Sequence, residues 1–559
     1  MAHACLPLQN ILRRRARDVV TVCDGRSRNG AQFYGRVAAL SRAFGEDLGV
    51  KPGDRVAIAG QSTDAFFEAF LAITACGGVP APLNWRWSLK EASYAFELCE
   101  ATVLVFDSST AGLWRGISRV SSKLRCGMVL GTATDGATVL PTSFHSSEAL
   151  ITERMGSELK LQWAPRDQAF VCFTSGSTGR PKAVVLSHTA LHSQSLAKLA
   201  VVSYSYSDVY LHTAPLFHIG GISSGMAMLM AGAKHIFMPK FSGTQAAALA
   251  RQFGVTALIA VPAMIVDIAN QEDPIHSVQT VLIGGGKMTE TYRTAAHEVF
   301  PNARLYTAYG MTEACSSITF QGPFLPNSSG GAPLENCAGF PAPGIEIAVH
   351  SKNGTGEGEI LTRGPHVMSG YWGQSEETTK AIDADGWLKT GDIGRLQLDG
   401  SLILSGRIKD VIKSGGENVH ASEVEGVIGA HGAVSQVAVV GVSDLRMGEL
   451  VSAAINLKEG WCWPEEEPLK EADFGSDVLL VGLGGEESEG KREKEVSLGG
   501  LLEHCSESGL SRFKIPRFWV VQRKPLPVTS SGKLRKEEIR SMLNKARLKM
   551  SDYYPRSRL

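Results

Sequence analysis

A glycine- and hydroxyl-rich segment, residues 172–182, directly follows the apolar run of residues 169–171. Glycines let backbone N–H groups turn toward an anion, hydroxyls add donors, and a lysine adds positive charge, which together suit nucleotide phosphates. The spacing differs from that of the common P-loop, because no Ser or Thr follows the lysine. A serine- and glycine-rich surface linker is the alternative. The hydroxyls, glycines and lysine concerned are Thr174, Ser175, Gly176, Ser177, Thr178, Gly179 and Lys182.

Length and composition describe an ordinary globular protein. The chain has 559 residues, which is too long for one core and predicts two to four domains or subdomains. Basic and acidic residues number 56 each, so no global field favours nucleic acid or an anionic membrane. No apolar run reaches about 18 residues, and we therefore expect no transmembrane helix.

The cysteines and the termini bear on the compartment. Ten cysteines form no CxxC pair and no zinc-ligand spacing, which predicts reduced, mostly buried thiols. The basic residues 13–15 precede no long apolar stretch, which argues against secretion. Residues 557–559, Ser-Arg-Leu, are a variant of the Ser-Lys-Leu peroxisomal address. We expect the peroxisomal import receptor to bind this end of the chain, and an accidental match is the alternative.

Helical and strand patterns alternate through most of the first four hundred residues. Residues 64–76 have apolar positions at helical spacing and are followed by two glycines, a helix stop. Short aliphatic runs each lie beside a helical segment, which predicts α/β layers with largely parallel strands. These runs are residues 55–58, 103–106, 257–260 and 280–283.

The pattern changes after about residue 340. Short strands with glycine turns predict a small β-rich subdomain, and a basic, hinge-like stretch follows Gly406. A compact α+β segment comes next, with strands expected at residues 437–442 and 518–521. The charged run of residues 459–500 interrupts this segment, and we expect it to be a solvated insertion loop.

Five further motifs lie downstream of residues 172–182. Gly284, Gly285 and Gly286 follow an expected strand and would let a flat ligand approach the backbone. Next come an aromatic face, a hydroxyl and a carboxylate, which could cover a purine, contact a phosphate and help hold Mg²⁺. The residues of this second motif are Tyr309, Gly310, Met311, Thr312 and Glu313.

The remaining three motifs lie further along the chain. Asp392 is a short acceptor that suits ribose hydroxyls, and Arg407 belongs to the basic stretch. Gly415, Gly416 and Glu417 form a glycine-rich turn, and Lys533 follows a glycine in a loop. Each motif alone is more often a turn or a solvated loop, whereas the whole set in this order is specific.

These motifs together resemble the adenylate-forming superfamily of acyl-CoA synthetases, luciferases and peptide-synthetase adenylation domains. The resemblance covers nearly the whole chain. It implies an AMP- and acyl-binding domain of layered α/β subdomains plus a small β-rich subdomain over residues 1–408. A mobile α+β domain over residues 409–545, with the insertion at 459–500, and a tail at 546–559 would follow. Lys409 would be the hinge.

The resemblance also implies a role for each motif. Residues 174–182 would form the phosphate loop, and residues 284–286 with Tyr309 would line the adenine. Thr312 and Glu313 would serve the α-phosphate and Mg²⁺. Asp392 and Arg407 would hold the ribose. Lys533 would bridge the acyl carboxylate and the phosphate, and residues 415–417 would help form the thiol-transfer site.

The chemistry implied is an attack of a carboxylate on the α-phosphate of ATP, followed by displacement of AMP from the acyl-adenylate by the thiol of CoA. No side-chain nucleophile is required, and none is evident. Ala183 stands where the family often has glycine, and His420 and Ala421 stand where an aromatic or Ile followed by Pro is common. Neither departure removes a chemical group that this mechanism needs.

Two segments bear on the acid. Residues 81–91 and 209–224 are more polar and aromatic than a long-chain fatty acid tunnel would be. They resemble plant 2-succinylbenzoate–CoA ligases of phylloquinone synthesis, as do residues 308–317 and 513–516. That resemblance implies 2-succinylbenzoate as substrate and the peroxisome as compartment, with the chloroplast second.

The expected acid carries a second carboxylate that must find a partner when buried. His218, Ser223 and Ser224 are its predicted donors, and Gly220 and Gly221 would leave room for the ring. The alternative for the two serines is a helix N-cap pair.

Three other functions stay open from the sequence. Another acyl-CoA ligase, 4-coumarate-like or medium-chain, would share all the motifs. An adenylation domain that loads a carrier protein is disfavoured because no carrier domain follows Lys533. A non-catalytic nucleotide-binding protein is disfavoured because the five key side chains remain. They are Lys182, Glu313, Asp392, Arg407 and Lys533.

Overall fold

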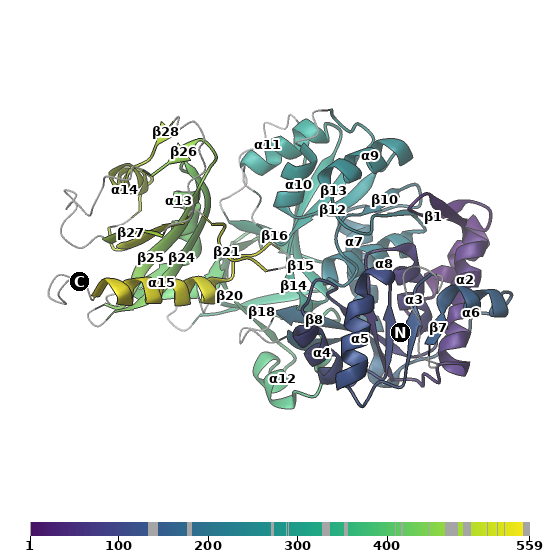
Figure 1. Cartoon of the computed structure of the whole chain (residues 1–559). Coiled ribbons are helices and arrows are strands. Elements are labelled where there is room, and N and C mark those ends of the chain that lie inside the picture. Colours follow the sequence, from purple (N-terminus) through teal and green to yellow (C-terminus); the bar gives the residue numbers. More distant parts are fainter. Residues whose placement is uncertain are drawn as a thin grey trace. The chain divides into compact units, whose positions relative to one another are not determined.

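The computed structural model (Figure 1) describes most of the chain. The described residues are 2–131, 144–175, 181–269, 273–286, 288, 290–326, 336–351, 356–407, 410–414, 417–444, 447–463, 479–483, 494–510, 512–522, 524–529 and 532–551. Two compact units divide the chain. The first comprises Met1–His350, Ile360–Thr390 and Leu396–Ile403, and the second comprises Ser351–Glu359, Gly391–Arg395 and Leu404–Leu559. The expected hinge, Lys409, lies outside the described residues.

A parallel five-stranded sheet lies in the first unit. Its strand order is β4-β3-β5-β6-β7. Pro80 and Pro82 lie on β4, and proline suits an edge strand because it cannot donate a ladder hydrogen bond. The strands are β3 (Arg55–Ala59), β4 (Val79–Leu83), β5 (Val103–Phe106), β6 (Cys126–Val129) and β7 (Phe144–Ser146).

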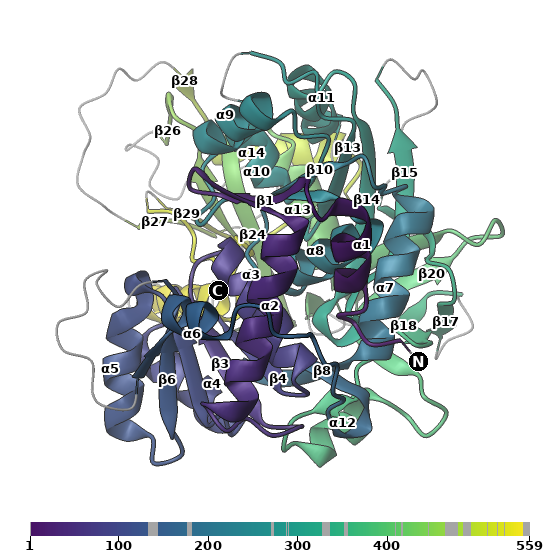
Figure 2. The same ribbon diagram turned by 90° about the vertical axis from the view of Figure 1, so that its right-hand side faces the viewer.

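Helices cover both faces of this sheet, because side chains alternate along each strand. Val56 and Ile58 of β3 belong to one core cluster, whereas Ala57 and Ala59 belong to another. Helices α2 and α6 lie side by side in Figure 2. The helices of this part are α2 (Gly30–Glu46), α3 (Asp64–Ala75), α4 (Leu89–Leu98), η1 (Ser108–Thr110), α5 (Ala111–Val120) and α6 (Ser147–Arg154).

Helix α3 confirms the helix expected at residues 64–76. Thr63 caps its N-terminus by accepting a hydrogen bond from the N–H of Phe66 at 3.1 Å. Every residue of α3 is buried, which explains why its sequence is apolar on nearly all sides.

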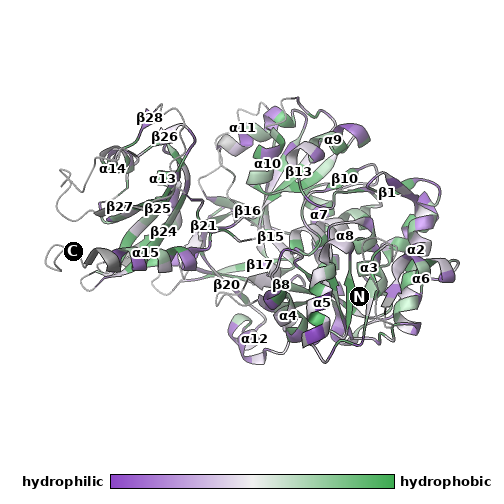
Figure 3. Ribbon diagram, viewed as in Figure 1, coloured by the Kyte–Doolittle hydropathy of each residue, from purple (hydrophilic) through white to green (hydrophobic). Residues whose placement is uncertain are grey.

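A larger sheet contains the parallel run β1-β11-β10-β12-β13-β14. The strands expected at residues 257–260 and 280–283 are β12 and β13, so both predictions are confirmed. Figure 3 shows hydrophobic residues on strands around β13 and hydrophilic ones on helix α9 (Gly243–Phe253). The strands are β1 (Val19–Cys23), β2 (Arg26–Asn29), β10 (Val209–His212), β11 (Lys234–Phe237), β12 (Ala257–Ala260), β13 (Thr280–Gly284) and β14 (Arg304–Met311).

Six helices and two 3₁₀ turns complete this part among the described residues. They are α1 (Pro7–Arg15), η2 (Pro165–Asp167), α7 (His188–Val201), α8 (Ile219–Ala231), α9 (Gly243–Phe253), α10 (Pro262–Ala269), α11 (Glu290–Val299) and η3 (Thr312–Ala314). Helices α7 and α8 pack against each other.

The strands expected after residue 340 are present and continue the larger sheet. Its order beyond β14 is β15-β16-β21-β20-β18-β17. They are β15 (Ser316–Phe324), β16 (Cys337–Pro341), β17 (Glu346–His350), β18 (Gly358–Arg363), β20 (Leu388–Leu396) and β21 (Leu402–Arg407). Short helix α12 (Ser375–Ala381) precedes β20 along the chain.

A separate antiparallel sheet of three strands has the order β19-β9-β8. The strands are β8 (Gln168–Ser175), β9 (Pro181–Ser187) and β19 (Gly370–Tyr371). Strands β8 and β9 form the two arms around the predicted phosphate loop.

The second unit contains a mixed sheet with the order β23-β22-β25-β29-β27, and β24 also pairs with β25. The expected strands at residues 437–442 and 518–521 lie within β24 and β29 and are confirmed. Its elements include β22 (Val411–Ser414), β23 (Glu417–His420), α13 (Ala421–Gly429), β24 (Val434–Asp444), β25 (Gly448–Leu457), α14 (Leu498–Glu507), β29 (Phe518–Gln522) and α15 (Lys536–Ser551).

The interpretation of residues 459–500 as a loop was wrong for three described strand segments and for the start of α14, which begins at Leu498. β27 (Leu479–Leu483) pairs in parallel with β29 and extends the sheet of the second unit. β26 (Trp461–Cys462) pairs with β28 (Lys494–Glu495). The apolar sequence of β27 suits a strand, although it stands between highly charged stretches. Residues 464–478 and 484–493 lie outside the described part.

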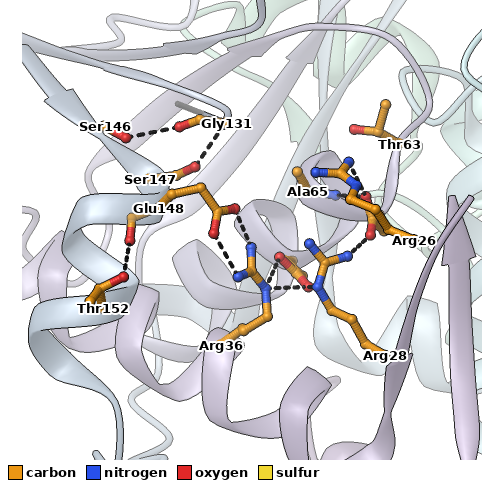
Figure 4. Close-up of polar contacts among 12 residues, drawn as sticks. Arg26, Arg28, Arg36, Thr63, Ala65, Gly131, Ser146, Ser147, Glu148 and Thr152 are labelled. Atoms are coloured by element: carbon orange, nitrogen blue, oxygen red, sulfur yellow. Dashed lines mark hydrogen bonds and ion pairs between the residues drawn. The ribbon is translucent and has the colours of Figure 1, made fainter. Parts of the chain in front are cut away.

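An ionic network joins α2, α3 and α6, as Figure 4 shows. Arg36 donates two hydrogen bonds to Glu148 at 2.9 and 2.6 Å and contacts Glu68 at 3.0 Å. Glu68 is fully buried, and Arg28 lies 3.4 Å from it. These arginines supply the charges that buried carboxylates need, so the loss of one partner would leave an unpaired buried charge between the three helices.

All ten cysteines lie in the described part and are free thiols, seven of them buried. Burial raises the pKa of the Cys99 thiol to about 12, so it stays protonated at neutral pH. The expectation of mostly buried thiols is confirmed. Within the described residues no helix is long and apolar enough to cross a membrane.

Candidate functional site

The predicted phosphate loop lies at the tip of the β8–β9 hairpin. Thr174 on β8 pairs with Lys182 on β9, and Ser175 pairs with Pro181. The hairpin therefore holds both ends of the loop in fixed register. Gly176, Ser177, Thr178 and Gly179 lie outside the described residues, so their contact with phosphate stays a prediction.

Lys182 is surrounded by an acidic and an aromatic side chain. Its Nζ donates to the Glu377 carboxylate at 2.7 Å and lies 4.6 Å from the centre of the Tyr371 ring. The hydrogen bond from Lys182, together with one from Lys380, lowers the pKa of Glu377 to about 2. Glu377 is thus ionised at neutral pH and competes with any phosphate for the Lys182 ammonium.

Glu313 follows directly on β14, in the η3 turn. Its carboxylate is buried and accepts a hydrogen bond from the Tyr371 hydroxyl at 2.9 Å. Its backbone carbonyl accepts from Met368 N–H at 2.8 Å, which fixes the segment before β19. Burial, followed by the charge of Glu313, raises the pKa of Tyr371, so its phenol remains a donor. Tyr371 thereby connects Lys182 and Glu313 in one cluster.

The chain turns sharply after Glu313 and has unusual backbone geometry there. Cys315 and Ser316 have φ values of 53° and 118°, a region that non-glycine residues rarely adopt. The turn also passes very close to Gly310, because a Cβ there would lie 1.6 Å from the Ser316 carbonyl oxygen. Gly310 is therefore required by this close approach, and backbone strain is concentrated beside the candidate site.

The other glycine motif lies beside this strand. Gly284 at the end of β13 pairs with Ala308 on β14, which places Gly284 next to Tyr309 along the ladder. Gly285 has a φ of +75°, and Gly286 is close to the Pro262 ring. The structure thus brings two of the predicted adenine-contacting segments together at the carboxyl ends of neighbouring parallel strands, a usual place for ligands.

Three predicted residues come together in the second unit. Arg407 Nε lies 3.0 Å from Asp392 Oδ1, and the Asp392 side chain is largely buried. Lys533 is exposed as a whole residue, yet its pKa is lowered, first by partial burial and then by the Arg407 charge, with Asp392 opposing. An ammonium that loses solvation beside a guanidinium suits an anionic ligand.

The structure describes the other predicted residues of this unit only in part. Glu417 begins β23, and its side chain is outside the described part. Gly415 and Gly416 are outside it altogether, so the role of this turn in thiol transfer stays a prediction.

The predicted acid-pocket residues lie on α8. His218 caps this helix and accepts a hydrogen bond from Gly220 N–H at its Nδ1, at 3.2 Å. Ser223 and Ser224 lie fully buried inside the helix, so the N-cap alternative for them is wrong. A Cβ at Gly220 would have no neighbour closer than 3.5 Å.

Gly221 differs from Gly220. A Cβ there would lie 2.2 Å from the Pro215 carbonyl oxygen, so this glycine permits close packing of α8 on the preceding loop. Room for a substrate ring is therefore not needed to explain it. The Oγ of Ser224 makes no hydrogen bond of good geometry within the described residues, although it lies near the Tyr210 hydroxyl.

Four residues that contact predicted residues or segments carried no assigned role in the sequence analysis. Tyr371 was assigned no role there, and Glu377 sits in an ordinary polar helix. Gln194 and Lys198 occupy polar positions of α7 that look solvent-exposed in the sequence. The spacing of four residues places them on one helix face, which is the signal that could have found them.

Comparisons with known proteins show the family of the chain. Residues 8–372 match the family described as AMP-binding enzyme, and residues 423–473 match the AMP-binding enzyme C-terminal domain. The chain belongs to the AMP-binding enzyme family, and it is an enzyme of the acid–CoA ligase class.

Two relatives and one solved structure show which enzymes this chain is similar to. A 2-succinylbenzoate–CoA ligase, chloroplastic/peroxisomal, from Arabidopsis thaliana is 39% identical and aligned over 96% of each chain. An indoleacetate–CoA ligase from Aromatoleum aromaticum is 29% identical over 92% of each. The solved o-succinylbenzoate CoA synthetase from Bacillus subtilis, in complex with its acyl-adenylate intermediate, has a TM-score of 0.76 and 23% identity. It covers 95% of this chain and 97% of its own, and it confirms the predicted fold class.

Proposed function

We propose that this chain is a 2-succinylbenzoate–CoA ligase that forms 2-succinylbenzoyl-CoA, AMP and pyrophosphate from the acid, ATP and CoA. The observation that carries the proposal is the 39% identity, over 96% of each chain, to a plant enzyme with that name. The polar, aromatic residues of segments 81–91 and 209–224 support it. The reaction belongs to phylloquinone synthesis in this proposal.

The first half-reaction joins two anions, and the described side chains suit that task. Lys182, at the base of the hairpin, is proposed to contact the β- and γ-phosphates once it leaves Glu377. Thr312 and Lys533 are proposed to donate to the oxygens on which charge develops at the α-phosphate. Asp392, held by Arg407, is proposed to accept hydrogen bonds from the ribose.

Glu313 fits a magnesium site in its chemistry. It is a buried carboxylate with one described hydrogen-bond donor, Tyr371, and Mg²⁺ is commonly bound by one or two carboxylates plus substrate phosphates. When bound, Mg²⁺ would offset phosphate charge. Tyr371 would then orient the Glu313 carboxylate toward the nucleotide.

The second half-reaction is the attack of the CoA thiol on the acyl carbonyl, which expels AMP. Residues 415–417 are proposed to take part after the C-terminal domain rotates about Lys409. Seven of the ten described cysteines are buried, and no covalent enzyme intermediate is required.

The compartment is proposed to be the peroxisome, reached through Ser557-Arg558-Leu559, with the chloroplast as a second site. The support is the plant relative, which is named chloroplastic/peroxisomal. Fluorescent fusions with the three terminal residues present or deleted test this address. Unchanged peroxisomal localisation after the deletion would contradict it.

An acid panel tests the proposed substrate. Initial rates of CoA-dependent AMP formation are measured with 2-succinylbenzoate, 4-coumarate, indoleacetate and octanoate. We expect the highest kcat/KM for 2-succinylbenzoate. A higher value for any of the other acids would replace the proposed substrate with that acid, and the indoleacetate–CoA ligase relative makes indoleacetate the most informative competitor.

A further inference from the structure

Lys198 is a fully buried cation on α7, and it is held by neutral groups. Its Nζ donates to Ser223 Oγ at 2.9 Å, and it lies 3.4 Å from both Gln194 Oε1 and Ser316 Oγ. Within the described part of the chain, no carboxylate lies at ion-pair distance from it. Lysine is rarely fully buried unless it is paired with an anion, so this position is unusual.

The burial of Lys198 changes the pKa of its ammonium group. Burial lowers the pKa of Lys198 to about 8, and the nearby Cys315 thiol acts in the opposite direction. Burial raises the pKa of Cys315 itself to about 12, so this thiol is neutral at pH 7. Lys198 is therefore mostly charged at neutral pH, with no counter-ion among the residues that the structure describes.

The three acceptors come from segments that the proposed chemistry uses. Ser223 lies on α8, the helix capped by His218, and Ser316 lies in the strained turn directly after Glu313. Gln194 clamps the same turn, because its Nε2 donates to the Ser317 carbonyl at 2.6 Å and its Oε1 accepts from Ser317 N–H at 3.1 Å.

The acceptors of the Lys198 hydrogen bonds differ in solvent exposure. Ser223 is fully buried, whereas Ser316 is partly exposed and holds Lys198 by one of the two longest contacts. Ser316 is thus the acceptor that an incoming anion could replace with the least disturbance. The buried Ser224 hydroxyl, on the same helix as Ser223, is a further donor that makes no well-formed hydrogen bond to any described residue.

We propose that Lys198 is a specificity-determining residue that binds the second, non-activated carboxylate of an aromatic dicarboxylic acid, in place of the Ser316 hydroxyl. The inference rests on the proposed function and assigns to Lys198 the main share of a role that the sequence analysis gave to His218, Ser223 and Ser224. A monocarboxylic acid would leave the ammonium without an anion, so the site selects against it.

A purely structural role of Lys198 predicts a different effect of its substitution. If Lys198 only joined α7, α8 and the turn, a neutral side chain of similar length would weaken the fold and affect all acids equally. If its charge serves the substrate, a neutral residue removes a desolvated charge from the empty protein and affects only the diacid.

The test compares 2-succinylbenzoate with two monoacids that each lack one of its carboxylates, 4-oxo-4-phenylbutanoate and 2-butanoylbenzoate. In the full-length wild-type enzyme, kcat/KM for the diacid should exceed that for the better monoacid by about 10²-fold or more, as expected when a buried charge loses its partner. Lys198→Met should bring this ratio down to within about tenfold of one, with monoacid turnover preserved. Lys160→Met, an exposed lysine of the same unit, is the matched control and should keep the wild-type ratio.

A second variant covers the case in which Lys198→Met fails to fold. Ser316→Asp places a carboxylate beside the ammonium and should also abolish the preference for the diacid. If both folded variants keep the wild-type ratio, or reduce kcat/KM for all three acids equally, Lys198 does not determine specificity. If Lys198→Met does not fold, the result for Ser316→Asp decides alone.

The proposed function and this inference fail in different ways. A wild-type enzyme that prefers another acid of the panel refutes the proposed substrate, whatever the variants do. A wild-type enzyme that prefers 2-succinylbenzoate, with variants that keep the preference, refutes the role of Lys198 and leaves the substrate in place.

Discussion

Lys533→Ala separates the two half-reactions and tests the proposed role of this lysine. The variant removes an ammonium whose lowered pKa reflects partial burial and the neighbouring Arg407 charge. If Lys533 contacts the charge that develops during adenylation, its loss slows that step alone. Thioester formation from a supplied acyl-adenylate involves no attack on phosphorus and should be nearly unchanged.

The magnitude follows from the surroundings of the ammonium. Two unit charges about 4 Å apart attract by about 1 kcal/mol in water and by about 4 kcal/mol at an effective dielectric constant of about 20. These values correspond to factors of roughly 5 and 10³ in rate. Because Lys533 is exposed as a residue but partly desolvated at its ammonium, we expect a loss on the order of 10²-fold, near that for one preorganised donor.

The assay follows each half-reaction by itself. Acid-dependent exchange of labelled pyrophosphate into ATP reports adenylation, and release of AMP from synthetic acyl-adenylate plus CoA reports thioester formation. Lys545→Ala, an exposed lysine on α15 of the same unit, is the control and should leave both rates unchanged. Equal losses in the two half-reactions for Lys533→Ala would refute its role as an adenylation residue.

Three further outcomes follow from contacts in the first unit. Glu377→Gln removes the carboxylate that holds Lys182 at 2.7 Å, so KM for ATP should fall a few-fold in steady-state kinetics; a higher KM would show that Glu377 positions the lysine instead. Gly310→Ala would place a Cβ 1.6 Å from the Ser316 carbonyl oxygen, and chemical denaturation should show a loss of at least about 2 kcal/mol, whereas unchanged stability would contradict the close packing. The pKa of Lys198 is lowered from 10.5 to about 8, so between these pH values the unfolded chain binds more protons and stability rises with pH. Relative to Lys198→Met, the wild-type free energy of unfolding should therefore gain roughly 3 kcal/mol over this pH window. A difference between the two proteins that does not change with pH would contradict the buried charge.

Much of the fold was predictable because its elements obey local rules. The alternation along β3 directs neighbouring residues into two different cores, and the helix after Thr63 has a cap and an apolar sequence. Such signals lie within one element and need no knowledge of distant contacts. The strand β27 was missed because an apolar segment of five residues stands between charged stretches that dominate the composition.

The candidate site was predictable only as a set of segments. The motifs indicated Lys182 and Glu313, but not that Tyr371, far along the chain, joins them. Likewise, a serine pair on α8 and a lysine on α7 carry no mark in the sequence that they meet. Lys198 reads as an ordinary polar residue of a helix until its neighbours on α8 and in the turn are known.

The fate of the oxygen atoms of the acid tests the central claim most directly. The full-length enzyme is given 2-succinylbenzoate labelled with ¹⁸O in both carboxyl groups, together with ATP and CoA, and the products are analysed by mass spectrometry. Activation through an acyl-adenylate predicts 2-succinylbenzoyl-CoA and AMP that carries one ¹⁸O atom per turnover. Formation of ADP, unlabelled AMP, or no CoA thioester of this acid would contradict the account.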